Sequence, residues 1–108
     1  MNLPHSIESY FAADQGKAGM APAGIFATDA TVVDEGMSHV GPEAIATWWK
    51  RAKEQYEHTA EPLHVVTSDE VTIVRARVTG QFPGSPAVLT YRFNLQDDQK
   101  IARLEIGA

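Results

Sequence analysis

The sequence contains no cysteine, which excludes disulfide bonds, thiolate metal sites and a cysteine nucleophile. No apolar run approaches the roughly 20 residues that a membrane-spanning helix needs. Residues 1–6 also lack the basic and then apolar pattern of a secretory signal. We therefore expect a cytoplasmic protein.

Positive charge is scarce as well. Nine lysines and arginines stand against 14 aspartates and glutamates, so the formal net charge is −5 at pH 7. Nucleic acids and anionic membrane surfaces both require clustered basic side chains. The composition therefore predicts neither a nucleic-acid partner nor a membrane partner.

The chain has enough apolar material for one core. Its 108 residues are 44% hydrophobic, and a chain of this length buries roughly two-thirds of the surface that it exposes when unfolded. We expect a single domain over residues 1–108.

Three helices are predicted in the first half of the chain. The first begins at Pro4 or Ser6 and ends at about Gln15, because Pro4 suits an initial helical turn and Gly16 suits an end. A short, weak second helix is predicted over residues 17–26, where Pro22 and two glycines interrupt the pattern. The third begins at Gly41-Pro42-Glu43, and its buried face carries Ile45, Trp48, Trp49, Ala52 and Tyr56.

The remainder is predicted to form strands. Short strands are expected over residues 31–34 and 38–40, and longer ones over residues 61–67, 70–82, 87–96 and 100–106. In the second long strand, apolar residues at 74, 76 and 78 alternate with Arg75 and Arg77, as in a strand buried on one face. Helices followed by hairpins indicate an α+β protein with an antiparallel sheet.

Several segments resemble the SnoaL-like branch of the nuclear-transport-factor-2 (NTF2) superfamily: residues 26–36, 41–45, Trp48-Trp49, 80–86, Tyr91-Arg92-Phe93 and Lys100-Ile101. The resemblance implies a cone-shaped, cystatin-like fold, with about three N-terminal helices on a bent antiparallel sheet. It also implies homodimerisation through the outer sheet face. Members of the superfamily include isomerases, cyclases, epoxide hydrolases and non-catalytic binding modules, so the fold alone does not define the function.

The resemblance to ketosteroid isomerases suggests catalytic residues. A gap-free alignment of residues 29–32 places Asp34 at the position of the base and Tyr10 at that of the tyrosine that donates to the enolate. Leu89 stands where the second acid is expected, so the known set of three residues is incomplete. In a comparison with limonene-epoxide-hydrolase-like enzymes, Arg75-Ala76-Arg77 offers an arginine in place of the required acid.

Histidines provide further candidates. His39 and His64 are predicted to point inward near Asp34, and His39 is the candidate to assist in proton transfer. His5, His58 and Glu35 are expected at the surface. No pair has metal-ligand spacing, so we predict neither a metal nor a cofactor.

The residues predicted to line a central pocket are aromatic, apolar or acidic: Phe26, Trp48, Trp49, His64, Leu89, Tyr91, Phe93 and Glu105. Trp48 and Trp49 lie about 100° apart on the helix, so they cannot both occupy one site. Plain core packing is the alternative for the aromatic residues. Three functional hypotheses stay open: an enzyme acting on a small, apolar, polyketide- or steroid-like molecule, a binding module without chemistry, and a dimeric accessory protein.

Overall fold

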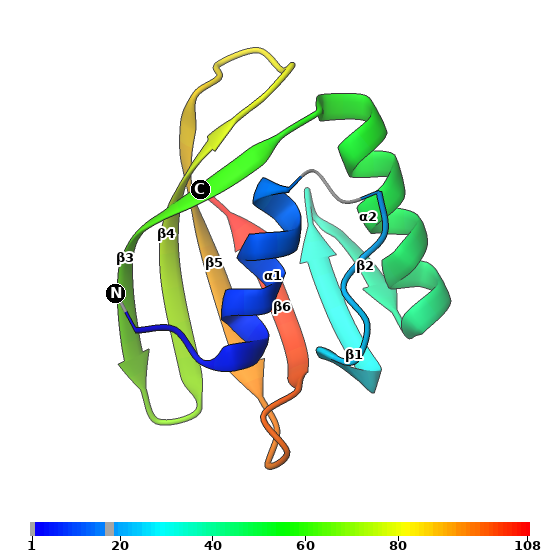
Figure 1. Cartoon of the computed structure of the whole chain (residues 1–108), viewed down its shortest axis with the longest axis vertical. Helices are drawn as coiled ribbons and strands as arrows, with labels where there is room; N and C mark the ends of the chain where they lie inside the picture. Colours follow the sequence, from blue (N-terminus) through cyan, green and yellow to red (C-terminus); the bar gives the residue numbers. More distant parts are fainter. Residues whose placement is uncertain (1, 17–18) are drawn as a thin grey trace.

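In a computed structural model, described here for residues 2–16 and 19–108, two helices lie on one side of a six-stranded sheet (Figure 1). The elements follow the order α1 (His5–Gln15), β1 (Phe26–Asp34), β2 (Met37–Val40), α2 (Pro42–Tyr56), β3 (Thr59–Ser68), β4 (Val71–Thr79), β5 (Ala87–Leu95) and β6 (Ile101–Gly107). The α+β class expected from the sequence is confirmed.

The sheet has the strand order β2-β1-β6-β5-β4-β3. Its neighbours are antiparallel except for β1 and β6, which run parallel. The expectation of a wholly antiparallel sheet is therefore wrong. Hairpins join β3, β4, β5 and β6, so these strands alternate in direction. The last of them, β6, pairs with β1, and no hairpin connects these two strands, so they can run parallel.

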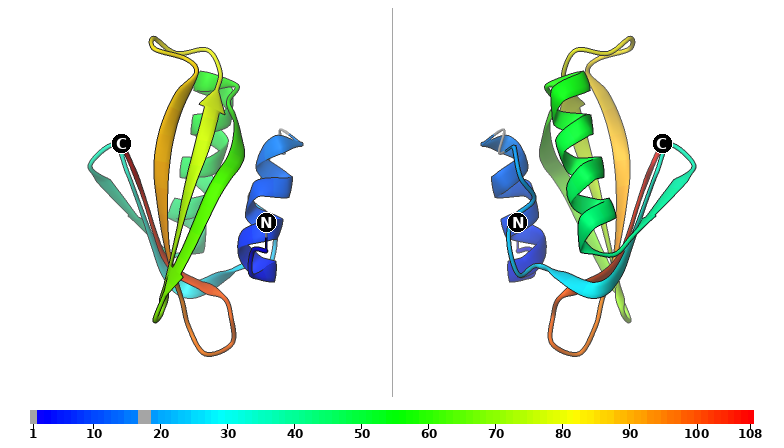
Figure 2. Two further views of the ribbon diagram at one scale, coloured as in Figure 1. Left: turned by 90° about the vertical axis from the view of Figure 1, so that its left-hand side faces the viewer. Right: turned by 90° about the vertical axis from the view of Figure 1, so that its right-hand side faces the viewer.

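The sheet is bent, so that β1, β2 and β6 turn away from β3 and β4 when the molecule is seen from the side (Figure 2). The pairing register shifts between Phe26 and Thr31 in β1, between Pro62 and His64 in β3, and between Asn94 and Leu95 in β5. Such bulges increase the local twist and bend a strand. The bend creates the concave face on which the helices pack.

The predicted short helix over residues 17–26 is not found. Lys17 and Ala18 lie outside the described residues, residues 19–25 form bends and turns, and Phe26 begins β1. Pro22 lacks a backbone N–H and Gly24 has a φ of 78°, so neither residue favours a helix. The count of about three helices is thus corrected to two, and neither described helix is long and apolar enough to cross a membrane.

The helix over Pro42–Tyr56 begins as the sequence predicts. Gly41 precedes it with a φ of 89°, a conformation that favours glycine, and Pro42 occupies the first turn. Its inward face buries Ile45 and Trp49, whose side chains are both 2% exposed. Trp49 meets Tyr10 of α1, with ring centroids 5.2 Å apart at nearly a right angle.

A buried carboxylate joins three elements of the fold. Asp14, 1% exposed on α1, accepts hydrogen bonds from Lys53 Nζ of α2 at 2.5 Å and from the backbone N–H of Ala60 on β3 at 2.6 Å. The Lys53 ammonium also donates to the backbone oxygens of Asp14 and His58, at 2.9 and 2.8 Å. Because every charge here has a partner, the cluster is tolerated in an otherwise apolar interior.

We expect Asp14→Ala to lower the free energy of unfolding by about 3–5 kcal/mol, because it leaves the Lys53 ammonium buried without its counter-charge. Urea unfolding at neutral pH measures this loss. The exposed pair Arg77–Glu61 supplies the control, since Glu61→Ala should cost no more than about 1 kcal/mol. Equal losses in the two variants would contradict the assignment.

Candidate functional site

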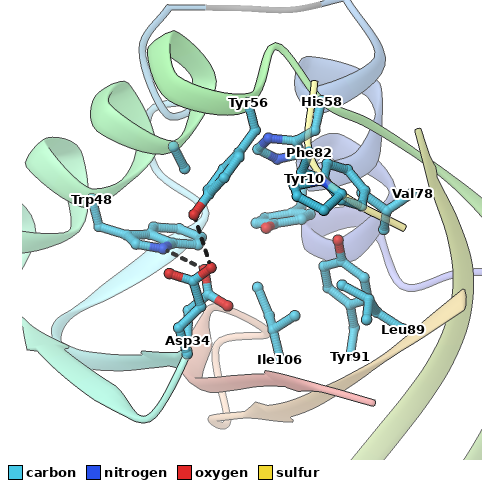
Figure 3. A pocket seen from close by; sticks show the side chains of 13 residues that line it. Tyr10, Asp34, Trp48, Tyr56, His58, Val78, Phe82, Leu89, Tyr91 and Ile106 are labelled. Atoms are coloured by element: carbon cyan, nitrogen blue, oxygen red, sulfur yellow. Dashed lines mark hydrogen bonds between the residues drawn. The ribbon is translucent and has the colours of Figure 1, made fainter. Parts of the chain in front are cut away.

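A cavity of about 400 Å³ opens between the bent sheet and the helices (Figure 3). This volume is typical of a site for a small organic molecule. Its wall is largely apolar and aromatic and contains no lysine or arginine; the lining residues are Tyr10, Asp34, Glu35, Trp48, Ala52, Tyr56, His58, Val78, Phe82, Pro83, Leu89, Tyr91 and Ile106.

Asp34 reaches the cavity because of its place in β1. Side chains alternate along a strand, and Val32, two residues earlier, is fully buried on the inner face. Asp34 is also the last residue of β1 and pairs with Ile106 of β6, another lining residue. The inward register of β1 therefore places the Asp34 carboxylate in the wall of the cavity, beyond the core residue Val32.

Burial of Asp34 raises the pKa of its carboxyl group. The indole of Trp48 opposes this effect, since its Nε1–H donates a hydrogen bond to Asp34 Oδ2 at 3.0 Å. The neighbouring Glu35 raises the pKa further, and the nearby His58 and His39 lower it. The net result is a carboxylate that binds a proton more strongly than one in water, as a general base requires.

Two tyrosine hydroxyls face the same space. Figure 3 shows the Tyr10 hydroxyl pointing toward the space in front of Asp34 and Trp48, and the Tyr91 hydroxyl pointing toward Tyr10. Burial raises the pKa of both phenols above the ordinary value, so both are protonated donors at neutral pH. Leu89, where the resemblance to ketosteroid isomerases implies the second acid, lines the cavity from β5, and Tyr91 lies two residues further along the same face of that strand.

A second carboxylate lies at the rim. The Tyr56 hydroxyl, at the end of α2, donates to Glu35 Oε1 at 3.0 Å, across the exposed edge of the cavity. Glu35 has a φ of 53° and lies in the turn between β1 and β2. This bond connects the end of α2 to the β1–β2 turn beside Asp34.

His58 lies where α2 passes into β3, and a glycine allows this close approach. A Cβ atom on Gly80 would come within 2.9 Å of the Cβ of His58 and 2.6 Å of the Tyr56 carbonyl oxygen. The Gln81 N–H also donates to that carbonyl at 2.6 Å. The residues that follow β4 thus pack directly against the backbone of Tyr56 and His58 at the edge of the cavity.

Of the residues predicted from the sequence, five converge on the cavity: Asp34, Tyr10, Trp48, Leu89 and Tyr91. They come from four elements, α1, β1, α2 and β5, which lie in both halves of the sequence. The choice between the adjacent tryptophans is also resolved, because Trp48 lines the cavity whereas Trp49 packs into the core.

Six predicted residues lie elsewhere. Trp49 and Phe93 are core residues, 2% and 0% exposed, and Phe26 packs against this core at the opposite end of β1 from Asp34. His39 is on the edge strand β2, its ring centroid 6.2 Å from that of Trp48. The other two are exposed on the outer sheet face, His64 opposite Arg75 and Glu105 opposite Arg92. For His64, the bulge after Pro62 sets which face the side chain takes.

Sequence reasoning missed several lining residues, above all His58 and Glu35, both expected at the surface. His58 follows the last turn of α2, and no periodicity extends beyond a helix end to predict its direction. The alternation of β4 and β6 could have indicated Val78 and Ile106, whose inward neighbours Ala76 and Leu104 are fully buried.

The chain belongs to the SnoaL-like domain family, whose model matches residues 7–104. This agrees with the resemblance drawn from the sequence. No curated protein is similar enough to count as a match.

Solved structures extend the comparison. A protein from Sinorhizobium meliloti, described as a candidate polyketide cyclase, is 46% identical, with a TM-score of 0.90 over 96% of this chain and 94% of that one. A Catenulispora acidiphila protein with a ketosteroid-isomerase-like fold, solved with trimethylamine, is 19% identical, with a TM-score of 0.83 over 99% and 87%. A second candidate polyketide cyclase, from Xanthomonas campestris, is 20% identical, with a TM-score of 0.75 over 94% and 85%. The two more distant structures establish the fold alone.

The chemistry that this site offers is proton transfer. Within residues 2–16 and 19–108, no three histidine, aspartate or glutamate side chains are grouped so that they could hold a metal ion. The cavity instead combines a base with a raised pKa, protonated phenols and an apolar surround.

We expect Asp34→Asn to stabilise the fold at neutral pH. The raised pKa means that folding disfavours the ionised carboxylate, a cost present above the folded-state pKa. As the pH falls through that pKa the wild type becomes protonated, so the two proteins should converge below the ordinary value near 3.8. Thermal unfolding across this pH range measures the difference, and a less stable variant at pH 7 would contradict the burial argument.

Proposed function

We propose that the cavity binds a small, largely apolar carbonyl compound and that Asp34 acts on it as an acid–base catalyst. The observation that carries this proposal is the raised pKa of the Asp34 carboxyl, in a cavity that Tyr10 and Tyr91 also face. Perturbed titratable groups in a concave apolar site are a common mark of catalysis.

The reaction that fits is abstraction of a proton from a carbon next to a carbonyl group. Asp34 takes the proton, the C–H electron pair forms a carbon–carbon double bond, and the carbonyl π electrons move to oxygen. The Tyr10 hydroxyl, with Tyr91 beside it, donates to the oxygen as its negative charge develops. Return of the proton to another carbon gives an isomer, and attack of the enolate carbon on a second carbonyl gives a ring.

The substrate class is supported by the relative from Sinorhizobium meliloti, which is described as a candidate polyketide cyclase. A polyketide carries several carbonyl groups, and the C–H groups between them are acidic. The wall of the cavity suits such a molecule, because apolar and aromatic side chains surround the few polar groups.

We expect the protein to accelerate exchange of the α-hydrogens of 2-tetralone, a bicyclic ketone, in D₂O. Proton NMR follows the loss of the α-hydrogen signal. Asp34→Asn should lose about 10²–10⁴-fold of the acceleration, the usual contribution of a positioned base. Tyr10→Phe should lose part of it, because a donor to the developing oxyanion is removed.

Asp29→Asn is the matched control, since Asp29 is an exposed aspartate on the same strand and should leave the rate unchanged. Quenching of Trp48 fluorescence reports binding separately from exchange. Binding without acceleration, or equal rates for wild type and Asp34→Asn, would contradict the catalytic proposal.

Binding without acceleration would support the second candidate, a non-catalytic binding module. One observation favours it, namely that Leu89 offers no proton at the position where ketosteroid isomerases carry their second acid. The same cavity then serves as a receptor for an apolar molecule.

We also infer a homodimer formed through the outer sheet face. Val66 and Val88 are large apolar residues that are 47% and 42% exposed on this face. Val88→Glu should therefore shift the protein toward the monomer in sedimentation experiments, whereas Glu61→Gln on β3, two strands away in the sheet, should not. A monomeric wild type would contradict the inference.

A further inference from the structure

One face of α2 lines the cavity with two aromatic residues and a small residue between them. Trp48, Ala52 and Tyr56 all belong to the lining. They follow one another at intervals of four residues, which places them along one stripe of the helix. Trp48 and Tyr56 are roughly 12 Å apart along the helix axis. Because the Ala52 side chain ends at Cβ, the cavity reaches the helix at this point between the two aromatic residues.

Each of the two aromatic residues is bound to a carboxylate. The indole of Trp48 donates to Asp34 Oδ2 at 3.0 Å, and the hydroxyl of Tyr56 donates to Glu35 Oε1 at 3.0 Å. Figure 3 shows both bonds as dashed lines that reach the same wall of the cavity. The bonds fix both rings and both carboxylates around the Ala52 side chain. We call these five residues the α2 recess.

The α2 recess is negatively charged. A carboxylate accepts hydrogen bonds and donates none, and no lysine or arginine is among the described residues that line the cavity. The lining residue His58 has its Nε2 3.3 Å from Oδ1 of Asp14, a carboxylate outside the lining. An anion or a carbonyl oxygen would therefore be repelled by Asp34 and Glu35, whereas a positive group would find counter-charges there.

The aromatic rings restrict the kind of cation. The faces of aromatic rings attract positive charge, and alkylated ammonium groups are the ligands that proteins commonly bind between such rings. Phe82 adds a third ring to this part of the cavity, with its centroid 6.1 Å from that of Tyr56 at nearly a right angle. A metal ion would require more oxygen ligands than this wall offers. An ammonium group with apolar substituents matches both the charge and the rings.

We propose that the α2 recess binds an alkylated ammonium group, so that the ligand of this cavity is an organic cation. This inference rests on the proposed function and extends it to the substrate class, a carbonyl compound that also bears a positively charged nitrogen. The donors for the carbonyl oxygen lie elsewhere, since Figure 3 shows Tyr91 across the cavity from Trp48. A positive nitrogen also makes the C–H bonds beside it more acidic, which favours proton removal by Asp34.

Two probes of the same shape test the α2 recess. (3-Hydroxyphenyl)trimethylammonium and 3-tert-butylphenol differ in that a positively charged nitrogen of the first replaces a neutral carbon of the second. Isothermal titration calorimetry at slightly acid pH, where both phenols are neutral, measures their affinities. The wild type should bind the cation about 5- to 30-fold more tightly. Added salt should weaken binding of the cation and not that of the neutral probe.

Variants at the two ends of the recess test which groups produce this preference. Glu35→Gln should reduce it about 2- to 5-fold, because a counter-charge is removed at the rim. Tyr56→Leu should reduce it by a similar factor, and Tyr56→Phe should keep most of it, because the ring remains. Glu70→Gln is the matched control, since it makes the same change of charge at an exposed residue in the turn between β3 and β4.

Ala52→Leu tests the position of the ammonium group. Leucine favours a helix almost as much as alanine does, but its larger side chain would fill the space between Trp48 and Tyr56. We expect this variant to bind the cation about tenfold more weakly or worse. If it does not fold, the Glu35→Gln and Tyr56→Leu variants still decide.

No binding of the cation, equal affinities for the two probes, or a preference unchanged in both Glu35→Gln and Tyr56→Leu would overturn the proposal. These measurements are independent of catalysis, and 2-tetralone, which is uncharged, tests Asp34 separately. A preference for the cation without exchange of 2-tetralone would overturn the Asp34 chemistry alone. Exchange without that preference would overturn the role of the α2 recess alone.

Discussion

The function proposed for this protein depends on one carboxylate, that of Asp34, which lies in a largely apolar cavity. A carboxylate in water is a weak base, because water stabilises its charge. At the end of β1 this stabilisation is largely replaced by one hydrogen bond from the Trp48 indole. The bend of the sheet produces the hollow, and the inward register of β1 carries the carboxylate into it. A flat sheet would leave the same residue in solvent.

The buried cluster around Asp14 connects stability to the site. It ties α1, α2 and the start of β3 together, and the same carboxylate lies beside the imidazole of His58. Replacing such a cluster by apolar residues often costs a protein little stability. The cluster also fixes the backbone of His58, a cavity residue, because Lys53 Nζ donates to the His58 carbonyl oxygen at 2.8 Å. The fold and the cavity are thus linked through one side chain.

The sequence predicted the elements well where a repeating pattern existed. The start of α2 at Gly41-Pro42 and the alternation of β4 both follow local rules that tertiary structure did not override. The parallel pairing of β1 with β6 could not be predicted, because no local signal specifies which strands meet across the length of the chain. Residues 17–26 have only a weak helical pattern, which Pro22 interrupts, and the predicted helix is wrong because residues 19–25 form bends and turns.

A residue of the site could be predicted from the sequence only where the repeat of a helix or strand indicates which way its side chain points. Asp34 and Tyr10 were found through the resemblance, and Leu89 and Tyr91 share one face of β5. His64 was assigned to the wrong face because a bulge in β3 breaks the alternation, and His58 was missed because it follows a helix end. Single-residue changes of register decide which side chains enter the cavity, and composition carries no information about them.

The most direct test is the pKa of Asp34 itself, measured by carbon NMR of the side-chain carboxyl groups, with Asp34→Asn identifying the resonance. We predict that this carboxyl group titrates above 3.8, the ordinary value for an aspartate. A titration of Asp34 at or below 3.8 would show that its charge is well solvated, and the acid–base mechanism would then be wrong.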